Sequence, residues 1–244
     1  MKRIIVCEDE ASIREFIVLN LKRSGFEVTD VGCGEDAIRA FTEHGGEFDV
    51  ALLDIMMPGI DGFEVCKRLR EMSDKIGIIM LSAKSQEIDK VSSLMMGADD
   101  YITKPFSVTE LVARVDAVCR RVNMTVDRAL NSPSTIESGP FTVDLKSRTV
   151  YKNGEPIDLT QVEYQIMEYF LKNQNTALDR MSILRSIWGD SYYGVEKIVD
   201  VNIRRIRMKI EDEPSSPKYI TTIWGYGYKW CSPEEQEPDE QDRH

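Results

Sequence analysis

The pattern of apolar and polar positions differs between the two halves of the chain. Over the first half, short apolar runs of strand length alternate with longer stretches in which apolar residues return every three or four positions, as along one side of a helix. This alternation predicts strands at 3–8, 27–31, 48–54, 77–83 and 99–104, and helices at 11–25, 34–46, 61–72, 86–97 and 107–122. The central strands are apolar throughout, which indicates burial on both faces. We therefore expect an α/β fold, a doubly wound parallel sheet of five strands with helices on both sides.

The second half breaks this pattern. Residues 123–137 are polar and without a clear period, which is typical of a linker. An Asn153–Gly154 pair then indicates a hairpin turn, and Thr160 with Glu163 forms a capping box before a helical pattern. The remaining periodicity predicts helices at 160–174, 179–189 and 195–211, an aromatic hairpin at 219–231, and an acidic, disordered tail at 233–244. We expect a first domain over 1–122 and a second, α+β domain over 138–232.

The charge distribution changes the class of partner that the chain can have. The net charge of −11 at first argues against a nucleic-acid partner. However, the excess of acidic residues lies in the first domain and in the tail, whereas 137–233 is neutral and has clustered arginines. This clustering is compatible with phosphate binding on one face of the second domain.

The cysteines, histidines and hydropathy argue against a cysteine metal site, a secreted or membrane protein, and a histidine-based active site. The five cysteines are scattered without metal-type spacing, and their odd number favours free thiols in a reducing cytoplasm. The apolar runs are too short to span a membrane, and the N-terminus lacks the pattern of a secretory signal. With two histidines in the chain, His44 and His244, a histidine-based active site is not expected.

Acidic residues follow two strands that should be neighbours in the sheet. Glu8 and Asp9 come directly after the first strand, and Asp54 ends the third. Three carboxylates brought together repel one another unless a cation joins them, and oxygen ligands with room for water suit Mg²⁺. Asp54 could instead accept a phosphoryl group as a nucleophile. The alternative is that all three are ordinary solvated carboxylates at the start of loops.

Two further strand ends favour phosphoryl chemistry. Ser82 ends the fourth strand, and Lys104 ends the fifth, followed by Pro105. A hydroxyl donor and an ammonium charge both suit the oxygens of a phosphoryl group. A cis peptide bond between Lys104 and Pro105 would fix the direction of the lysine.

Four motifs over residues 1–121 resemble those of the flavodoxin-like receiver domain of two-component response regulators. They are "VCEDE", "LLDIMMPGIDG", "MLSAK" and "DDYITKPF", in matching order and spacing. The resemblance implies that Asp54 accepts a phosphoryl group from a sensor histidine kinase, while Ser82 and Lys104 contact its oxygens. It also implies Mg²⁺ as cofactor, held by Glu8, Asp9, Asp54 and the Met56 carbonyl. Tyr101 matches the switch aromatic; as a purely structural residue it would be a partly exposed tyrosine on an edge strand.

Charges around the last strand and helix of the first domain match the OmpR/PhoB subfamily, whose active receivers dimerise through this face. The resemblance implies three pairs between copies: Lys90 with Glu110, Asp100 with Arg114, and Asp99 with Arg121. A twofold contact would make each pair occur twice. The alternative for each charge taken singly is a solvated surface position.

The stretch 195–210 combines an apolar face with a run of basic residues. Val195, Ile198, Val199, Ile203, Ile206 and Ile210 recur at helical spacing. Residues 138–231, with "VDVNIRRIRMKIE" and "TIWGYGYKW", resemble the winged-helix effector domain of the same subfamily. The resemblance implies a helix in the major groove, with Val201 and Arg205 nearest the bases. The other implied DNA-binding residues are Lys197, Arg204, Arg207, Lys209, Thr222 and Trp224, and the last stands where some relatives have a wing arginine.

The sequence thus favours a response-regulator transcription factor of the cytoplasm that is activated by phosphorylation and is not a dedicated enzyme. The expected partners are a histidine kinase, double-stranded promoter DNA, a second copy and RNA polymerase, with no membrane. One alternative is a DNA-binding protein with a vestigial receiver. Another is a Mg²⁺-dependent aspartyl-phosphate phosphatase, although such a site would want a second aspartate where Met56 stands.

Overall fold

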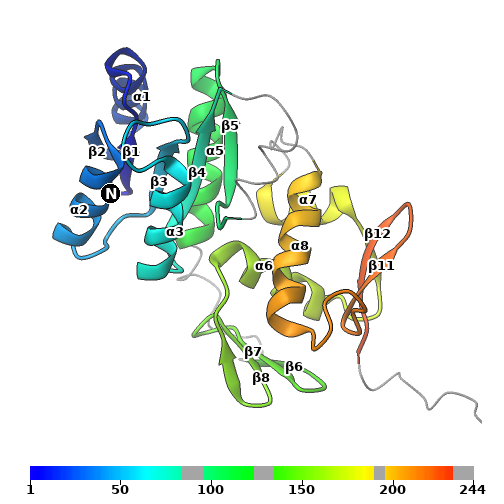
Figure 1. The fold of residues 1–244 in the computed structure, drawn as a ribbon. Coiled ribbons are helices and arrows are strands. Elements are labelled where there is room, and N and C mark those ends of the chain that lie inside the picture. The colour runs from blue at the N-terminus through cyan, green and yellow to red at the C-terminus, as the bar shows by residue number, and fades with distance from the viewer. Residues whose placement is uncertain (84–95, 124–134, 190–195, 233–244) are drawn as a thin grey trace, which may run out of the picture.

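A five-stranded parallel sheet forms the first domain. In this computed structural model the described residues are 1–83, 96–123, 135–189 and 196–232. The strands are β1 (Arg3–Cys7), β2 (Glu27–Val31), β3 (Val50–Asp54), β4 (Gly77–Ser82) and β5 (Asp100–Thr103), in the order β2-β1-β3-β4-β5. All neighbouring strands pair in parallel. The predicted doubly wound sheet is confirmed (Figure 1).

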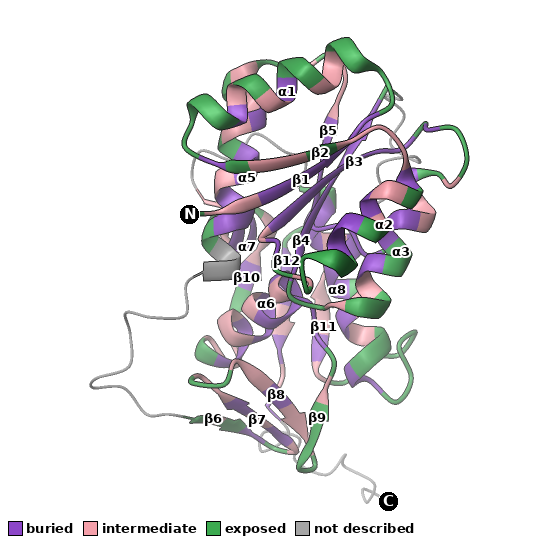
Figure 2. Cartoon of the chain, turned by 90° about the vertical axis from the view of Figure 1, so that its left-hand side faces the viewer, coloured by how far each residue is buried: buried purple, intermediate pink, exposed green. Residues whose placement is uncertain are grey.

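Helices cover both faces of this sheet. They are α1 (Ala11–Arg23), α2 (Gly34–Glu43), α3 (Gly62–Met72) and α5 (Val108–Asn123), while the helix predicted at 86–97 lies largely outside the described residues. Every residue of β3 and β4 is buried, as their apolar sequences predict (Figure 2). Leu21 of α1 and Leu111 of α5 pack on one face, and Phe41 of α2 and Leu69 of α3 pack on the other.

The second domain joins a four-stranded antiparallel sheet to three helices and a hairpin. Its elements are β6 (Thr135–Ser138), β7 (Phe141–Asp144), β8 (Thr149–Lys152), β9 (Glu155–Ile157), α6 (Gln161–Lys172), β10 (Ala177–Asp179), α7 (Arg180–Trp188), α8 (Lys197–Ile210), β11 (Ile220–Ile223) and β12 (Gly227–Trp230). β6 pairs with β7, so this sheet begins three residues before the predicted boundary at 138. The turn at Asn153–Gly154 is confirmed, with φ values of 53° and 84°.

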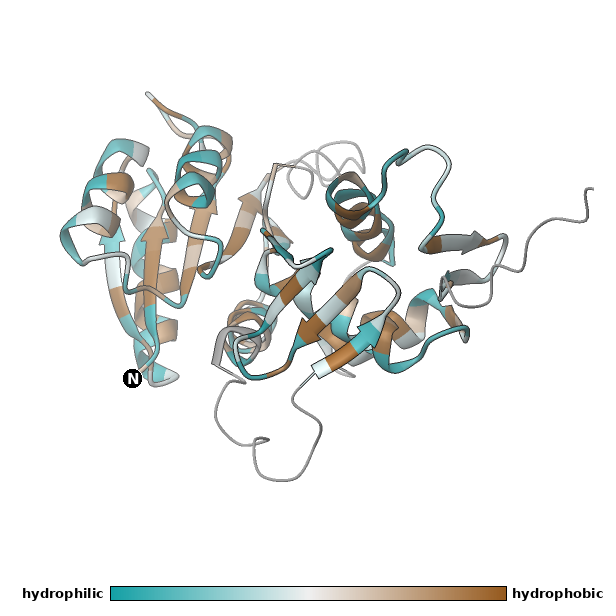
Figure 3. Ribbon diagram, turned by 90° about the horizontal axis from the view of Figure 1, so that it is seen from below, coloured by the Kyte–Doolittle hydropathy of each residue, from teal (hydrophilic) through white to brown (hydrophobic). Residues whose placement is uncertain are grey.

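Aromatic side chains fill the core of the second domain. Trp188 and Trp230 are buried, as expected for core residues, and the ring of Phe141 packs edge-on against Trp230 with centroids 5.2 Å apart. Figure 3 shows apolar residues gathered on the strands and on the inner sides of the helices in both domains. The second domain lies on the β5 side of the first, where α6 contacts α5. The described helices are all too short or too polar to cross a membrane.

The predicted capping box at the start of α6 is confirmed. Glu163 N donates to Thr160 Oγ1 over 3.4 Å, and Thr160 N donates to Glu163 Oε2 over 2.8 Å. Each bond satisfies a backbone N–H that has no partner within the helix.

We expect Thr160→Ala to lower the free energy of unfolding by about 1 kcal/mol, because the cap acceptor is lost. Thr160→Ser keeps the hydroxyl and should retain most of that stability. Urea denaturation followed by circular dichroism measures both variants, and an equal loss in the two would contradict a role for the hydroxyl.

Candidate functional site

The ends of β1 and β3 bring three carboxylates together. The two strands are parallel neighbours, with Cys7 opposite Leu53, so the residues that follow them emerge at the same edge of the sheet. Carboxylate oxygens of Glu8, Asp9 and Asp54 lie within 4.8 Å of one another. Glu8 and Asp54 are buried and Asp9 is exposed, which leaves one side open to water. This donor set fits Mg²⁺, which prefers oxygen ligands and keeps several waters.

Lys104 completes this group, which we call the acidic pocket: Glu8, Asp9, Asp54 and Lys104. Lys104 Nζ lies 2.9 and 2.7 Å from the two carboxylate oxygens of Glu8 and 3.1 Å from Asp54 Oδ2. Burial raises the pKa of Glu8, although the hydrogen bond from Lys104 works in the opposite direction. Glu8 and Asp54 therefore share one ammonium in a largely buried place, with Asp9 beside them, and a further cation would be stabilised there.

The ends of β4 and β5 lie at the same edge. Ser82 is buried and pairs with Thr103, while the preceding residue, Leu81, pairs with Asp54. Lys104 N donates to Ser82 O over 2.7 Å, which ties the two strand ends together. The Lys104–Pro105 peptide bond is cis, as suggested by the sequence. The structure thus brings Ser82 to the same edge of the sheet as the four residues of the acidic pocket.

Gly62, the first residue of α3, allows that helix to approach Asp54 from behind. A Cβ atom at this position would lie 2.2 Å from the carbonyl oxygen of Asp54. Gly62 N also donates to the carbonyl of Ile55 over 3.2 Å. The glycine was visible in the sequence, but its role depends on a close approach between backbones that no local pattern reveals.

Arg14 of α1 is a supporting residue that sequence reasoning missed. Its Nη1 donates to the carbonyl oxygens of Glu8 over 2.6 Å and of Asp9 over 3.2 Å. Arg14 therefore holds the loop that presents the two carboxylates. Because its partners are backbone carbonyls, no residue type at a fixed spacing marks this role.

Met56 is exposed and Tyr101 is buried in the structure. Met56 is 59% exposed beside the pocket, where its carbonyl was implied as a ligand. Tyr101 on β5 is 4% exposed, so the partly exposed position expected for an edge-strand tyrosine is wrong. It belongs to an apolar cluster that includes residues of the second domain, and such a contact leaves no trace in local sequence.

The charges predicted to join two copies make bonds within one chain. Arg114 Nη1 lies 3.0 Å from Asp100 Oδ1, and Arg114 Nη2 lies 3.0 Å from Glu110 Oε1. Asp99 Oδ2 accepts from Ile78 N over 2.7 Å and pairs with Arg70. Lys90 and the side chain of Arg121 lie outside the described residues. The pairs between copies stay predictions.

Some basic residues of α8 are exposed, and others make hydrogen bonds within the second domain. Lys197 and Arg204 are exposed. Arg207 instead donates to Ile220 O over 2.9 Å and to Thr222 Oγ1 over 3.0 Å, and Lys209 donates to Asp158 O over 2.7 Å. Arg207 thus fastens the β11–β12 hairpin to α8. Trp224, at the tip of that hairpin, is 92% exposed.

Val201 and Arg205, the implied base-reading residues, are not presented to solvent in this structure. Val201 is 4% exposed, and the side chain of Arg205 is 10% exposed. Arg205 Nε lies 3.0 Å from Oε1 of the buried Glu163 on α6. Neither side chain is open to DNA in this structure, and the implied contacts of Val201 and Arg205 with bases stay predictions.

Comparisons with known proteins agree with both halves of the structure. The family model described as "Response regulator receiver domain" matches residues 4–116, and that described as "Transcriptional regulatory protein, C terminal" matches residues 154–230. The sensory transduction protein RegX3 of Mycolicibacterium smegmatis is 41% identical over 94% of this chain and 99% of its own length. An uncharacterized transcriptional regulatory protein of Bacillus subtilis, YcbL, is 41% identical over 92% of this chain and 98% of its own.

Among solved structures, a mutant of RitR resembles this chain. It has a TM-score of 0.74 and 26% identity, covering 94% of this chain and 99% of that one. The likeness therefore extends over both domains.

Proposed function

The chain belongs to the two-component response regulators of the OmpR/PhoB type, and from this membership we propose that phosphorylation of Asp54 controls its binding to promoter DNA. A receiver domain joined to a DNA-binding domain makes it a transcription regulator, and its relatives are regulators rather than dedicated enzymes. The observation that carries the proposal is the acidic pocket, with Asp54 between Glu8, Asp9 and Lys104, in the same chain as the basic helix α8.

The pocket supports phosphoryl transfer from a phosphohistidine. A carboxylate oxygen of Asp54 attacks phosphorus, the bond from phosphorus to the imidazole nitrogen of the kinase breaks, and an acyl phosphate forms on Asp54. Lys104, which already reaches Asp54 Oδ2, would stabilise the added negative charge. Ser82, at the neighbouring strand end, would donate its hydroxyl to a phosphoryl oxygen. Glu8, Asp9 and Asp54 would hold Mg²⁺, which supplies charge neutralisation when bound.

Binding to DNA is proposed through α8 and the β11–β12 hairpin. A helix with exposed Lys197 and Arg204 fits the major groove, where these cations meet phosphates. Trp224 at the hairpin tip reaches toward sugar and phosphate rather than reading the minor groove as an arginine would. Val201 and Arg205 would read bases once they are uncovered.

Dimerisation is proposed through β5 and α5, by exchange of the Asp100–Arg114 pair between two copies. Lys90–Glu110 and Asp99–Arg121 are the other two proposed pairs. The proposed partners are a sensor histidine kinase, double-stranded promoter DNA, RNA polymerase and a second copy, and the proposed place of action is the cytoplasm.

The two alternatives are less well supported. A phosphatase of the kind considered would want a carboxylate two residues after Asp54, and the residue there is Met56. A vestigial receiver would not need the complete set of phosphoryl-binding residues. In this chain Lys104 contacts both Glu8 and Asp54, and Ser82 lies at the neighbouring strand end.

We expect Arg204→Ala to weaken binding to all duplex DNA sequences alike, because an exposed guanidinium that contacts phosphate adds affinity without reading bases. The slope of log K against log salt concentration should become shallower by about 1. Fluorescence anisotropy over a salt series measures this slope. Arg39→Ala, which removes an exposed arginine on α2, is the matched control, and equal slopes in the two variants would exclude Arg204 from the DNA contact.

A further inference from the structure

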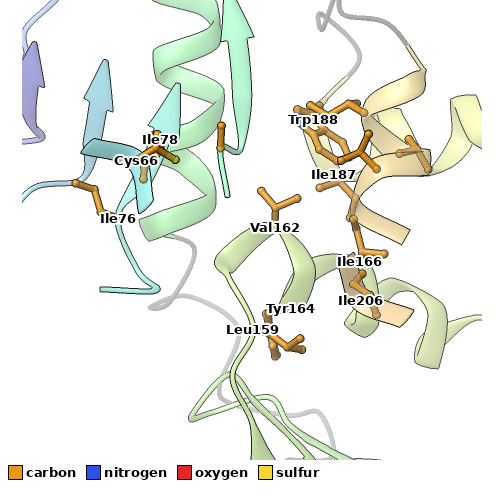
Figure 4. Packing of buried hydrophobic residues seen from close by; sticks show 14 of the residues in the cluster. Cys66, Ile76, Ile78, Leu159, Val162, Tyr164, Ile166, Ile187, Trp188 and Ile206 are labelled. Atoms are coloured by element: carbon orange, nitrogen blue, oxygen red, sulfur yellow. The ribbon is translucent and has the colours of Figure 1, made fainter. Parts of the chain in front are cut away.

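α8 gathers positive charge on the side that faces away from its own domain core. At 100° per residue, Lys197 and Arg204 lie within about 20° of each other and opposite Ile206. Ile206 is buried in the core, close to Ile166 of α6 (Figure 4). Lys197 and Arg204 are exposed, and neither pairs with a carboxylate of the described residues. We call Lys197, Arg204 and the half-buried Arg207 the basic face of α8.

The surroundings of the basic face favour an anionic partner. Asp200, an acidic residue on the same side of the helix, accepts from Arg180 Nε and from the Tyr228 hydroxyl, each over 2.7 Å, so its charge is already offset. A groove of about 400 Å³ is lined by Arg204, Arg207, Met208, Pro214 and Ser215. The basic face therefore offers both cations and room to a segment that carries carboxylates.

The chain leaves the second domain beside this face. Trp230 pairs with Ile220 across the β11–β12 hairpin, and Arg207 Nε donates to the carbonyl of the same Ile220 over 2.9 Å. Ser232, two residues after Trp230, is the last described residue. Residues 233–244, which we call the tail, lie outside the described residues and hold six acidic residues and one arginine.

The tail is long enough to reach all of the basic face. A chain of twelve residues without secondary structure has a root-mean-square span of about 20 Å. The fourteen residues of α8 rise about 21 Å along the helix axis. Since the tail begins a short distance from Arg207, its carboxylates can meet Arg204 and Lys197 further along the helix.

We propose that the tail binds the basic face of α8 and competes there with the phosphates of DNA. Carboxylate and phosphate oxygens are recognised by the same guanidinium and ammonium donors. Because the tail is tethered, its effective concentration is about 1 mM, which fills a site with a dissociation constant of about 0.1 mM in about nine chains of ten. The tail then lowers the affinity for every duplex by the same factor. The inference rests on the proposed function for DNA as the competing ligand.

A full-length chain with a neutral tail tests the proposal. The six acidic residues of the tail are replaced by their amides: Glu234→Gln, Glu235→Gln, Glu237→Gln, Asp239→Asn, Glu240→Gln and Asp242→Asn. The matched control makes the same change in net charge at six exposed residues of the first domain: Glu15→Gln, Glu27→Gln, Glu43→Gln, Glu47→Gln, Glu71→Gln and Asp74→Asn. Fluorescence anisotropy with a mixed-sequence duplex measures the affinity of each chain over a salt series.

We expect the neutral-tail variant to bind about tenfold more tightly than wild type at about 50 mM salt, because every chain is then free to bind. The factor should shrink as salt rises, since salt screens the contact between tail and helix. The control should bind like wild type. Equal gains in the neutral-tail variant and the control would overturn the proposal, because the effect would then belong to net charge and not to the tail.

A measurement without DNA locates the contact. Phenylglyoxal modifies accessible arginines, and peptide mass mapping gives the rate at each position. Arg204 should react about tenfold more slowly in wild type than in the neutral-tail variant, because only about one chain in ten has the tail released. Arg39 on α2 should react equally in both. Equal rates at Arg204 would overturn the contact. If no chain binds the duplex, the proposed function fails, while the rate at Arg204 still decides whether the tail binds α8.

Discussion

Asp54→Asn abolishes phosphoryl uptake. With Mg²⁺ and acetyl phosphate, the wild-type chain should gain the mass of one phosphoryl group and the variant none. The amide has almost the shape of the carboxylate but is a poor nucleophile, so no acyl phosphate forms. Intact-protein mass spectrometry measures the gain directly. We expect the loss to be complete, because the other two carboxylates of the acidic pocket, Glu8 and Asp9, are proposed as metal ligands rather than as acceptors.

The control for this prediction is Asp74→Asn, which removes an exposed carboxylate in the loop before β4. It should gain the same mass as wild type. Circular dichroism shows whether Asp54→Asn is folded. A phosphoryl gain on folded Asp54→Asn would place the acceptor at another residue.

Glu163→Ala is the substitution expected to cost the most stability. Glu163 is fully buried on α6, and its oxygens lie 3.0 Å from Arg205 Nε and 2.8 Å from Lys209 Nζ. It also accepts from Thr160 N in the capping box. Removing the carboxylate leaves buried positive charge without its partner, which typically costs about 3–5 kcal/mol. Urea denaturation at neutral pH measures the loss.

The pH dependence of this loss gives a second measurement. Burial works to raise the pKa of Glu163, but Arg205, Lys209 and the hydrogen bonds outweigh it, and the pKa is lowered from 4.5. A lowered pKa means that the stabilisation is present above the ordinary pKa and is lost as pH falls through the folded-state value. The difference in free energy of unfolding between wild type and Glu163→Ala should therefore shrink in acid.

Glu168→Ala on the same helix is the matched control, because Glu168 is partly exposed and pairs with Lys172 one turn away. It should change stability by only about 0.5 kcal/mol. A loss as large as that of Glu163→Ala would show that the effect belongs to the helix rather than to the buried ion pair.

The features predicted correctly from sequence depend on local periodicity or on sheet topology. Apolar runs and helical spacing are properties of neighbouring residues, so the strands and helices followed from them. Once the sheet is doubly wound, β1 and β3 are neighbours, and Glu8, Asp9 and Asp54 must meet at one edge. The acidic pocket could therefore be predicted before any coordinates were known.

The features that sequence reasoning missed depend on contacts between distant segments. Arg14 binds backbone carbonyls, and Gly62 matters because the backbone of Asp54 lies behind it. Tyr101 and Val201 are buried in an apolar cluster that contains residues of both domains. The helical pattern of 195–210 shows which side of α8 faces its own core, but the occupant of the opposite side is decided by tertiary structure.

The affinity of the full-length chain for duplex DNA, before and after treatment with Mg²⁺ and acetyl phosphate, tests the central claim most directly. Wild type should bind about tenfold more tightly after treatment if phosphorylation of Asp54 controls DNA binding as proposed and about a tenth of the untreated chain is competent to bind. Asp54→Asn, measured in parallel, should not respond. Equal affinity of wild type before and after treatment, with the phosphoryl mass present, would contradict the account and indicate a receiver that does not control DNA binding.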